Sequence, residues 1–304
     1  MKKRIWLICG LAALALTAGL LPQSSGKGIA YRVSGGRNPM VLLGSIHVGS
    51  REMYPFASGL QKALDEADAF VFECDTKSAD AARLTAQMMQ LSSGSLQDLI
   101  SPEVYEKLAQ TAEKYRFDFN ALQNLKPWAV VSMLSMETAA DGMGARNASA
   151  AAALGVENRV HAQVKDRPKL YLETVQEQLE TLNGMSAPLQ MYLLESACDD
   201  LLDGKIGNDT SKWPDWWREG NADAFADSYQ QELKAEKQPE LAREYHEALM
   251  TRRNVLMAER LARLLEDDTG RSYFVTVGLM HLVLPDDSVL SALEAMGYTI
   301  EPLS

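Results

Sequence analysis

Two stretches near opposite ends of the chain share one pattern of apolar and polar positions. In each, a mostly apolar run leads into a Gly and, three residues later, a His, at residues 40–47 and 273–281. Each run predicts a buried strand that ends in a tight turn presenting one imidazole. The chain has only four histidines, so two of them, His47 and His281, share this local context.

The similarity between the two stretches extends beyond the histidines. Residues 60–67 have helical spacing and are followed by an apolar strand at 69–72 that ends in Glu73. Residues 289–296 also have helical spacing, and a short strand at 298–300 follows. Both ends therefore predict strand, Gly-x-x-His, helix and strand, which indicates two related halves. In open α/β sheets ligands bind at the carboxyl ends of strands, so both histidines are expected at that rim.

The rest of the chain is mainly helical by pattern. Residues 29–34 predict a short edge strand that forms a hairpin with the first His strand. Helical patterns dominate residues 78–165 and 187–265, and between them residues 168–173 predict a third strand that ends on a carboxylate, Glu173. The predicted fold class is α/β (α+β). It has a central mixed β-sheet with two quasi-equivalent halves and a large helical insertion at about residues 78–165.

The first 26 residues follow a separate pattern. A basic stretch at residues 2–4 precedes an uncharged apolar run at residues 5–21, and a polar break follows. This order is typical of a secretory signal peptide. The run of 17 residues is near the lower limit for a spanning helix, so an uncleaved membrane anchor is the alternative. Both predict an exported, extracytoplasmic protein, secreted or anchored by residues 5–21, whose domain spans residues 29–304.

Composition and charge narrow the classes of partner. The chain is 46% hydrophobic and 23% charged, which is ordinary for a globular protein. Without residues 1–26 it loses three positive charges, so the formal charge falls from −11 to −14. A surface this acidic argues against nucleic acid, whose binding needs clustered Lys and Arg. It also argues against an anionic membrane surface, which leaves the N-terminal segment as the only predicted membrane contact.

Two cysteines and two further histidines are given structural roles. Cys74 and Cys198 are compatible with one disulfide in an exported protein, and two unpaired buried thiols are the alternative. Cys74 follows Glu73 directly, but strand alternation would point it the opposite way, so a catalytic thiol is not favoured. His161 and His246 lie beside polar residues on predicted helices and are expected to be solvated.

The paired histidines and the strand-end carboxylates together suit a divalent metal. Neutral imidazoles and carboxylates bind Mn, Fe, Co or Zn, and an open coordination position would hold a water whose pKa the metal lowers. We assign His47, Glu73 and His281 as metal ligands. Glu173 would be a fourth ligand or the general base, and Arg253 would stabilise an oxyanion or bind a substrate carboxylate. The structural alternatives are a simple turn for each His, a helix cap or ion pair for Glu73, and an ion pair with a Glu for Arg253.

A set of short motifs, taken in order, makes the chain resemble the TraB/GumN family. The resemblance covers about residues 29–304, and its main motifs are Gly44–His47, Phe72–Glu73, Lys126–Trp128, Leu172–Thr174, Arg253–Asn254 and Gly278–Val283. One departure is Leu284, where members often have a Gly. The family is similar to the ectodomain of Tiki-type metalloproteases and, more distantly, to haem-uptake and erythromycin-esterase-like proteins.

This resemblance implies both a fold and an activity. It implies an α/β core with two quasi-equivalent halves and a cleft that holds both Gly-x-x-His histidines and a Glu. It also implies a metal-dependent hydrolase, a peptidase using Mn, Co or Zn on a peptide or protein substrate. The helical middle is expected to cover the cleft.

Two alternatives of a different class stay open. A non-catalytic haem- or metal-binding protein would need an apolar slot beside His47 or His281. A metal-free, esterase-like hydrolase would use one His as general base with a carboxylate partner. A hydrolase needs a polar cleft on which Glu173 and Arg253 converge, and the sequence does not decide among these functions.

Overall fold

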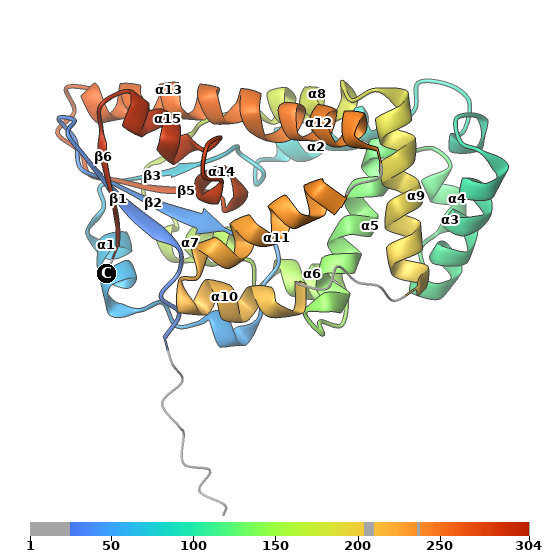
Figure 1. Ribbon diagram of the computed structural model, residues 1–304, viewed down its shortest axis with the longest axis horizontal. Coiled ribbons are helices and arrows are strands. Elements are labelled where there is room, and N and C mark those ends of the chain that lie inside the picture. Colours follow the sequence, from blue (N-terminus) through green and yellow to red (C-terminus); the bar gives the residue numbers. More distant parts are fainter. Residues whose placement is uncertain (1–24, 204–209, 236–237, 304) are drawn as a thin grey trace, which may run out of the picture.

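A six-stranded mixed β-sheet forms the centre of the computed structural model, which describes residues 25–203, 210–235 and 238–303 (Figure 1). In spatial order its strands are β4 (Lys169–Tyr171), β3 (Ala69–Phe72), β5 (Tyr273–Gly278), β2 (Met40–Ser45), β1 (Ala30–Ser34) and β6 (Thr299–Pro302). The neighbours from β4 to β2 are parallel, whereas β1 and β6 run antiparallel to their neighbours. The predicted mixed α/β fold is therefore confirmed.

The central strands are apolar because both faces of the sheet are covered. Every residue of β2 and β3 is buried, and Phe70, Phe72 and Phe274 are fully buried. Such continuous apolar runs are typical of parallel strands between two layers. Phe72 pairs with Thr276 and with Tyr171, so the carboxyl ends of β3, β4 and β5 meet at one edge of the sheet.

The first strand does not lie where the sequence predicted. The expected hairpin is confirmed, since β1 pairs antiparallel with β2. The prediction that β1 is an edge strand is wrong, because β6 pairs along its other side and forms the edge. Three of the four β6 residues are exposed, so burial along β6 gives little sign of which strand it pairs with.

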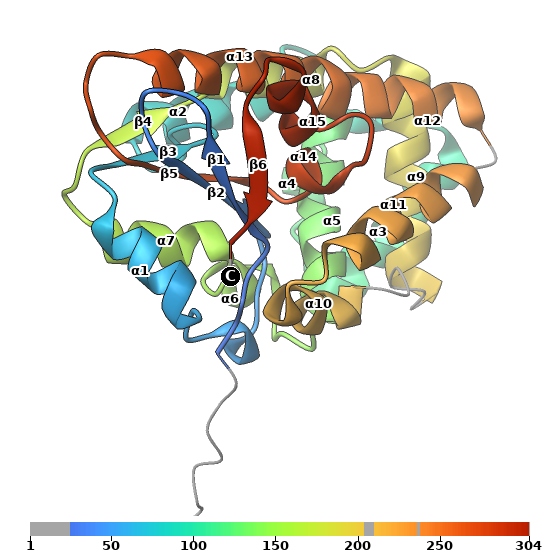
Figure 2. The same cartoon turned by 60° about the vertical axis from the view of Figure 1, so that its left-hand side comes forward.

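Helices cover the two faces of the sheet. The views in Figures 1 and 2 place α13 (Arg252–Glu266) and α15 (Val289–Ala295) on one face, and α1 (Ser58–Glu66) and α7 (Val156–Val164) on the other. Leu64, Val160, Leu261 and Leu293 are buried in one core with the strands. The short helix α14 (Met280–Val283) follows β5 directly.

The predicted helical middle is confirmed and has a second core. Its elements are α2 (Ala79–Met89), α3 (Pro102–Tyr115), α4 (Phe119–Leu122), α5 (Pro127–Gly142), α6 (Ala148–Ala152) and α7. Ser101 caps α3 by accepting the Val104 N–H, and Pro102 occupies the first turn, as its fixed φ allows. Leu108 and Leu134 pack with Leu194 of α9 (Ala187–Asp203), so α3, α5 and α9 form an apolar cluster apart from the sheet.

The second helical region folds back over the carboxyl edge of the sheet. After β4 it contains α8 (Val175–Asn183), α9, α10 (Trp213–Glu219), α11 (Ala222–Ala235) and α12 (Pro239–His246). A π-helical segment, η4 (Glu247–Thr251), joins α12 to α13. Wide turns of this kind occur often at functional sites. The remaining short elements are the 3₁₀ helices η1 (Arg51–Met53), η2 (Leu96–Asp98) and η3 (Thr210–Lys212).

Two predictions about the chain's ends and its thiols can be compared with this fold. The apolar run at residues 5–21 lies outside the described residues. In the part of the chain that is described, no helix is long and apolar enough to cross a membrane. Cys74 and Cys198 are both free and buried, so the alternative of two unpaired thiols is confirmed over a disulfide.

Candidate active site

Two neighbouring strand ends bring the predicted acidic residues together. Glu73 directly follows β3, and Glu173 lies two residues beyond the end of β4. The parallel pairing continues past the strands, because the Glu173 N–H donates to the Glu73 carbonyl oxygen at 2.6 Å. Glu173 also precedes Thr174, which caps α8 together with Glu177 in a capping box. Register and helix capping therefore fix both carboxylates at the same edge.

Arg253, in the first turn of α13, joins the two carboxylates. Its Nη2 lies 3.0 Å from Glu73 Oε2 and 2.7 Å from Glu173 Oε2, and its Nε donates to Glu173 Oε1 at 3.0 Å. Gln178 on α8 donates to both carboxylates, at 3.1 and 3.3 Å. The side chains of the three charged residues are at most 13% exposed. This buried Glu–Arg–Glu group carries one net negative charge.

A backbone donor holds the other oxygen of Glu73. The Gly278 N–H, at the end of β5, donates to Glu73 Oε1. A Cβ atom at position 278 would lie only 2.8 Å from that oxygen, so this close approach requires glycine. Burial raises the pKa of Glu73, but the charges of His281, Arg253 and His47 and the Gly278 N–H outweigh it and lower the pKa to about 2. Glu73 is therefore ionised at neutral pH.

His281 is buried and oriented by Asn254. The Asn254 Nδ2 donates to the Asp287 carbonyl oxygen at 2.8 Å, which turns Asn254 Oδ1 toward His281 Nδ1, 2.6 Å away. His281 Nδ1 must then carry the proton, and Nε2 keeps a lone pair 4.0 Å from Glu73 Oε1. Burial, opposed by Glu73 and assisted by Arg253, lowers the pKa of His281 to about 4, so the ring is neutral at pH 7.

His47 lies at the same rim in a different environment. Its side chain is 66% exposed, and its Nδ1 is 3.7 Å from Glu157 Oε2 on α7. Its backbone packs tightly, because a Cβ atom at Gly155 would lie 2.3 Å from the His47 carbonyl oxygen. Burial, the largest influence, raises the pKa of Glu157, and the charge of His47 opposes this. The backbone of His47 is therefore fixed while its imidazole faces solvent.

One cavity of about 450 Å³ collects these groups. His47, Glu73, Arg253, Gly278 and His281 line it, together with apolar residues from α5, α10, α11 and the π-helical segment. The helical middle contributes Ser135, Met136 and Ala139 of α5, while Trp213, Phe225, Tyr245, Leu249 and Met250 come from the second helical region. The prediction that residues 78–165 cover the cleft thus describes only part of the wall. Glu173 lies behind Arg253 and lines a neighbouring cavity of about 530 Å³ with it.

The donor chemistry of this rim can be compared with the needs of a divalent metal. Nitrogen and oxygen ligands lie about 2.0–2.2 Å from Zn, so at tetrahedral angles two ligands of one ion are about 3.3–3.6 Å apart. The 4.0 Å separation between His281 Nε2 and Glu73 Oε1 is wider than this by about 0.5 Å, so the two side chains would have to move closer together to hold Zn. Asn254 also leaves Nε2 of His281 with the lone pair that a metal needs, as outer-shell partners of metal-binding histidines do. Within the described residues, no three His, Cys, Asp or Glu side chains are arranged as a complete metal site.

Sequence reasoning missed several residues that orient the site. Asn254 was noted only as part of a motif, and nothing indicated a role for Gln178, the Gly278 N–H or Asp287. These roles depend on contacts between distant segments, so local periodicity carries no signal for them. The position of Asn254, directly after Arg253 on a helix that faces the sheet edge, is the one local hint.

The two remaining histidines are not solvated, and that prediction is wrong. The His161 side chain is 10% exposed and stacks on Phe72 with ring centroids 3.8 Å apart. Burial lowers the pKa of His161 to about 4. His246 is 26% exposed and lies between the Tyr229 hydroxyl at 3.0 Å and Asp287 Oδ2 at 2.9 Å.

Cys74 lies close to the carboxylates without acting as a nucleophile. Its Sγ donates to Gln178 Oε1 at 3.1 Å, and Gln178 in turn donates to Glu73. Burial, with smaller contributions from Glu73, Glu157 and Glu173, raises the pKa of the Cys74 thiol to about 12. The thiol is therefore protonated at neutral pH, which argues against a catalytic thiolate.

Comparisons with known proteins point to one family. The sequence model of the TraB/PrgY/gumN family matches residues 29–302. A protein named YbaP from Escherichia coli strain K12, described as uncharacterized, is 25% identical over 249 residues, covering 79% of this chain and 83% of YbaP. YbaP from Shigella flexneri matches with the same identity and coverage. No solved structure matches the chain significantly.

Proposed function

Because the chain belongs to the TraB/PrgY/gumN family, we propose that it is a hydrolase that activates water beside His281 and Glu73. The observation that carries this proposal is the orientation of His281. Its Nδ1 is fixed by Asn254, and its Nε2 faces an ionised Glu73 across 4.0 Å in a cavity of about 450 Å³. A neutral imidazole with a free Nε2 beside a carboxylate is an arrangement that can accept a proton from water.

The polar groups divide the work of this reaction. Without a metal, His281 Nε2 takes the proton of a water molecule, and the imidazolium that forms is stabilised by Glu73 and by Asn254 Oδ1. Arg253 donates to both carboxylates through Nε and Nη2, so it holds Glu73 and Glu173 in place. Glu173 pairs with Arg253 and lines the neighbouring cavity of about 530 Å³ instead of the one that holds His281, which favours this positioning role over that of a base.

A divalent metal such as Mn, Co or Zn forms part of the proposal. His281 Nε2 and Glu73 Oε1 would bind it, with His47 as the third ligand, and His281 would then not act as the base, because the metal takes up the free lone pair of its Nε2. When bound, the metal would lower the pKa of a coordinated water so that hydroxide is present near neutral pH. Substrate is proposed to be a peptide or protein and the site of action to be extracytoplasmic, with residues 5–21 as export signal or anchor.

The first test measures metal and hydrolysis on the full chain. Bound metal is determined by elemental analysis with and without added Mn, Co and Zn, beside a His47→Ala/His281→Ala double variant. We expect one ion per chain in the wild type and none in the double variant, while a His161→Phe control keeps its ion. Cleavage of a fluorogenic peptide library that stops with chelator supports the metal-dependent reaction.

The same experiment separates the alternatives. Hydrolysis that persists with chelator but is lost in His281→Ala would support a metal-free reaction with His281 as base. A chain that binds no metal and cleaves no peptide would contradict the proposal.

Haem binding is the second candidate, because the cavity wall beside the histidines is largely apolar. Met136, Trp213, Phe225 and Met250 line it next to His47 and His281. Haem titration of the same variants, followed by the Soret band, tests it. A stoichiometric spectrum that changes in His281→Ala would favour a binding protein over a hydrolase.

A further inference from the structure

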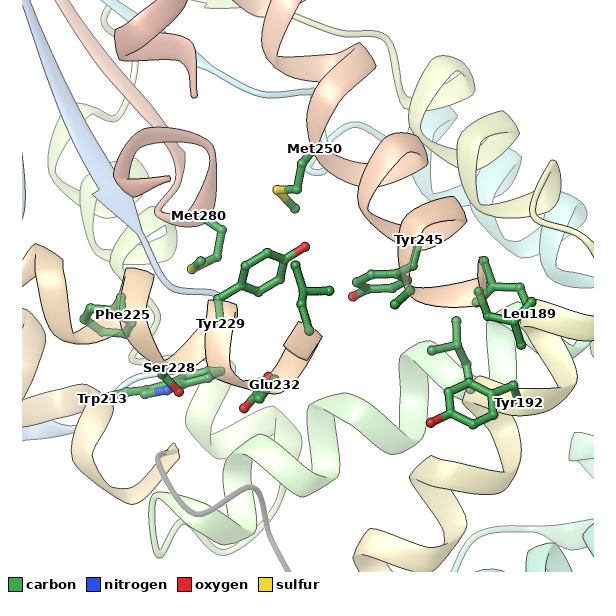
Figure 3. Close-up of a pocket in the computed structure, with 14 residues that line it drawn as sticks. Leu189, Tyr192, Trp213, Phe225, Ser228, Tyr229, Glu232, Tyr245, Met250 and Met280 are labelled. Carbon is green, nitrogen blue, oxygen red and sulfur yellow. The ribbon is translucent and has the colours of Figure 1, made fainter. Parts of the chain in front are cut away.

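We propose that an apolar cavity beside the candidate active site holds one bulky apolar side chain of a peptide substrate. This side pocket has a volume of about 380 Å³ and lies between α9, α10, α11, α12 and the π-helical segment (Figure 3). The inference rests on the proposed hydrolase function and names the substrate class of that site.

The side pocket adjoins the active-site cavity. Five residues line both spaces, namely Trp213, Phe225, Tyr245, Met250 and Met280. Met280 directly precedes His281 in the chain. A molecule at His281 therefore needs to extend only past these shared residues to place a side chain in the side pocket.

The wall of the side pocket suits an apolar group. Leu189 and Leu193 of α9, Leu233 of α11 and Leu241 of α12 all line it. Met250 and Met280 point into the same space in Figure 3, and methionine adapts its shape to irregular apolar partners. Burial of apolar surface would drive binding there, and aromatic walls favour an aromatic guest.

The polar group of Tyr229 is already bonded within the protein. In Figure 3 its ring extends into the pocket toward Tyr245. Its hydroxyl bonds to His246 Nδ1 at 3.0 Å, and His246 Nε2 bonds to Asp287 Oδ2 at 2.9 Å. These bonds hold the ring of Tyr229 as part of the wall. Because its hydroxyl already has a hydrogen-bond partner, a substrate does not need to supply a polar group for it.

Volume and charge limit the guest further. Its volume of about 380 Å³ is at the small end of the roughly 300–1,000 Å³ of pockets that enclose whole small molecules, so it has room for a bulky side chain and is too small for a length of peptide. The exposed Glu232 lines the pocket, and the chain carries a formal charge of −11, so an acidic guest is disfavoured. The preferred guest is an uncharged aromatic or branched aliphatic side chain such as Phe or Leu.

A binding experiment tests the pocket without requiring catalysis. The probe is N-phenyl-1-naphthylamine, whose fluorescence rises in apolar surroundings, added to the full chain. We expect Leu193→Trp and Leu233→Trp, which fill the pocket from two different helices, to raise the Kd at least tenfold. The matched control Leu99→Trp, at a side chain 51% exposed, should stay within twofold of the wild type.

Competition with small peptides supplies a measurement that needs no variant. N-acetyl-phenylalaninamide should displace the probe from the wild type at least tenfold better than N-acetyl-aspartate amide. Equal displacement by the two, or equal probe affinity in folded filling variants and the wild type, would overturn the pocket.

Hydrolysis then separates failure of the pocket from failure of the proposed function. On fluorogenic peptides that differ at one residue, kcat/KM should favour Phe and Leu over Gly and Asp at least tenfold, and the filling variants should lose that preference. Hydrolysis without side-chain preference would contradict the pocket and leave the hydrolase intact. Probe binding that the filling variants abolish, without any hydrolysis, would contradict the hydrolase while supporting the pocket as a binding site.

Discussion

The two Gly-x-x-His segments begin alike and end in different environments. Ser45 and Gly278 pair in register on the neighbouring parallel strands β2 and β5. Nevertheless, the His47 side chain is 66% exposed and the His281 side chain is 5% exposed. The shared motif therefore fixes where the chain leaves the sheet, and the residues beyond it decide how the imidazole is used.

The difference arises in the first turn after each glycine. After Gly278 the chain enters α14 at once, which folds His281 back against Asn254. After Gly44 no helix starts until η1, and the backbone at His47 packs against Gly155. The buried half of the site, formed by His281, Asn254, Glu73 and Arg253, thus provides an oriented, neutral base. The exposed half, formed by His47, provides a side chain that can contact substrate or metal.

Removing the charge that supports the buried half should have the largest effect. Arg253→Met leaves two buried carboxylates without their shared partner, and breaking such a buried ion group costs about 3–5 kcal/mol. Urea unfolding followed by circular dichroism measures the change. The control is Arg252→Met, at a neighbouring side chain 72% exposed, which should unfold like the wild type. Equal stability of the two variants would show that Arg253 does not hold the buried half together.

A methyl group at the second glycine should act on the same half. In Gly278→Ala the new Cβ would lie 2.8 Å from Glu73 Oε1, and Arg253 and Gln178 prevent that carboxylate from moving away. We expect a loss of about 1–3 kcal/mol in the free energy of unfolding. Thr276→Val, two residues earlier, removes a buried hydroxyl that has no hydrogen-bond partner, so it should not destabilise the chain. An unchanged Gly278→Ala variant would mean that Glu73 is free to shift.

Histidine burial can also be read from the pH dependence of stability. Burial, then Lys77 and Lys169, lower the pKa of His161 from 6.5 to about 4. Between these values the unfolded chain binds the proton and the folded chain does not, so stability falls as pH falls. His161→Phe keeps the ring on Phe72 and removes the titration. From pH 7 to pH 5 the wild type should therefore lose about 1–2 kcal/mol more than the variant. Parallel curves for the two proteins would place His161 in solvent.

The pattern of apolar and polar residues was sufficient to predict the strands and helices that have a regular local periodicity. Apolar runs gave β2, β3 and β5, and helical spacing gave the helices between them. The partner of β6 was not predictable, because strand pairing between residues 30–34 and 299–302 depends on the whole chain.

The candidate site divides in the same way. His47, Glu73, Glu173 and His281 follow directly from their positions at strand ends. The role of Asn254 as the partner of His281 was missed, as was the part of the cavity wall formed by Trp213, Phe225, Tyr245, Leu249 and Met250. These residues reach the site only through tertiary packing.

The exposed half gives the smallest expected effect on stability and the sharpest test of the comparison. His47→Ala removes a side chain that is 66% exposed, so the free energy of unfolding should stay unchanged within error. His281→Ala leaves the buried Asn254 Oδ1 without its partner and should destabilise the chain by about 1–3 kcal/mol. The proposed function requires both variants to lose metal binding or hydrolysis, despite this difference in stability. If His47→Ala keeps full activity, His281 and its buried neighbours carry out the reaction without His47. The first Gly-x-x-His motif would then contribute to folding and not to the reaction. If both variants are inactive while only His281→Ala is destabilised, the two histidines act in one site, in which His281 is the rigid, buried member and His47 the accessible one.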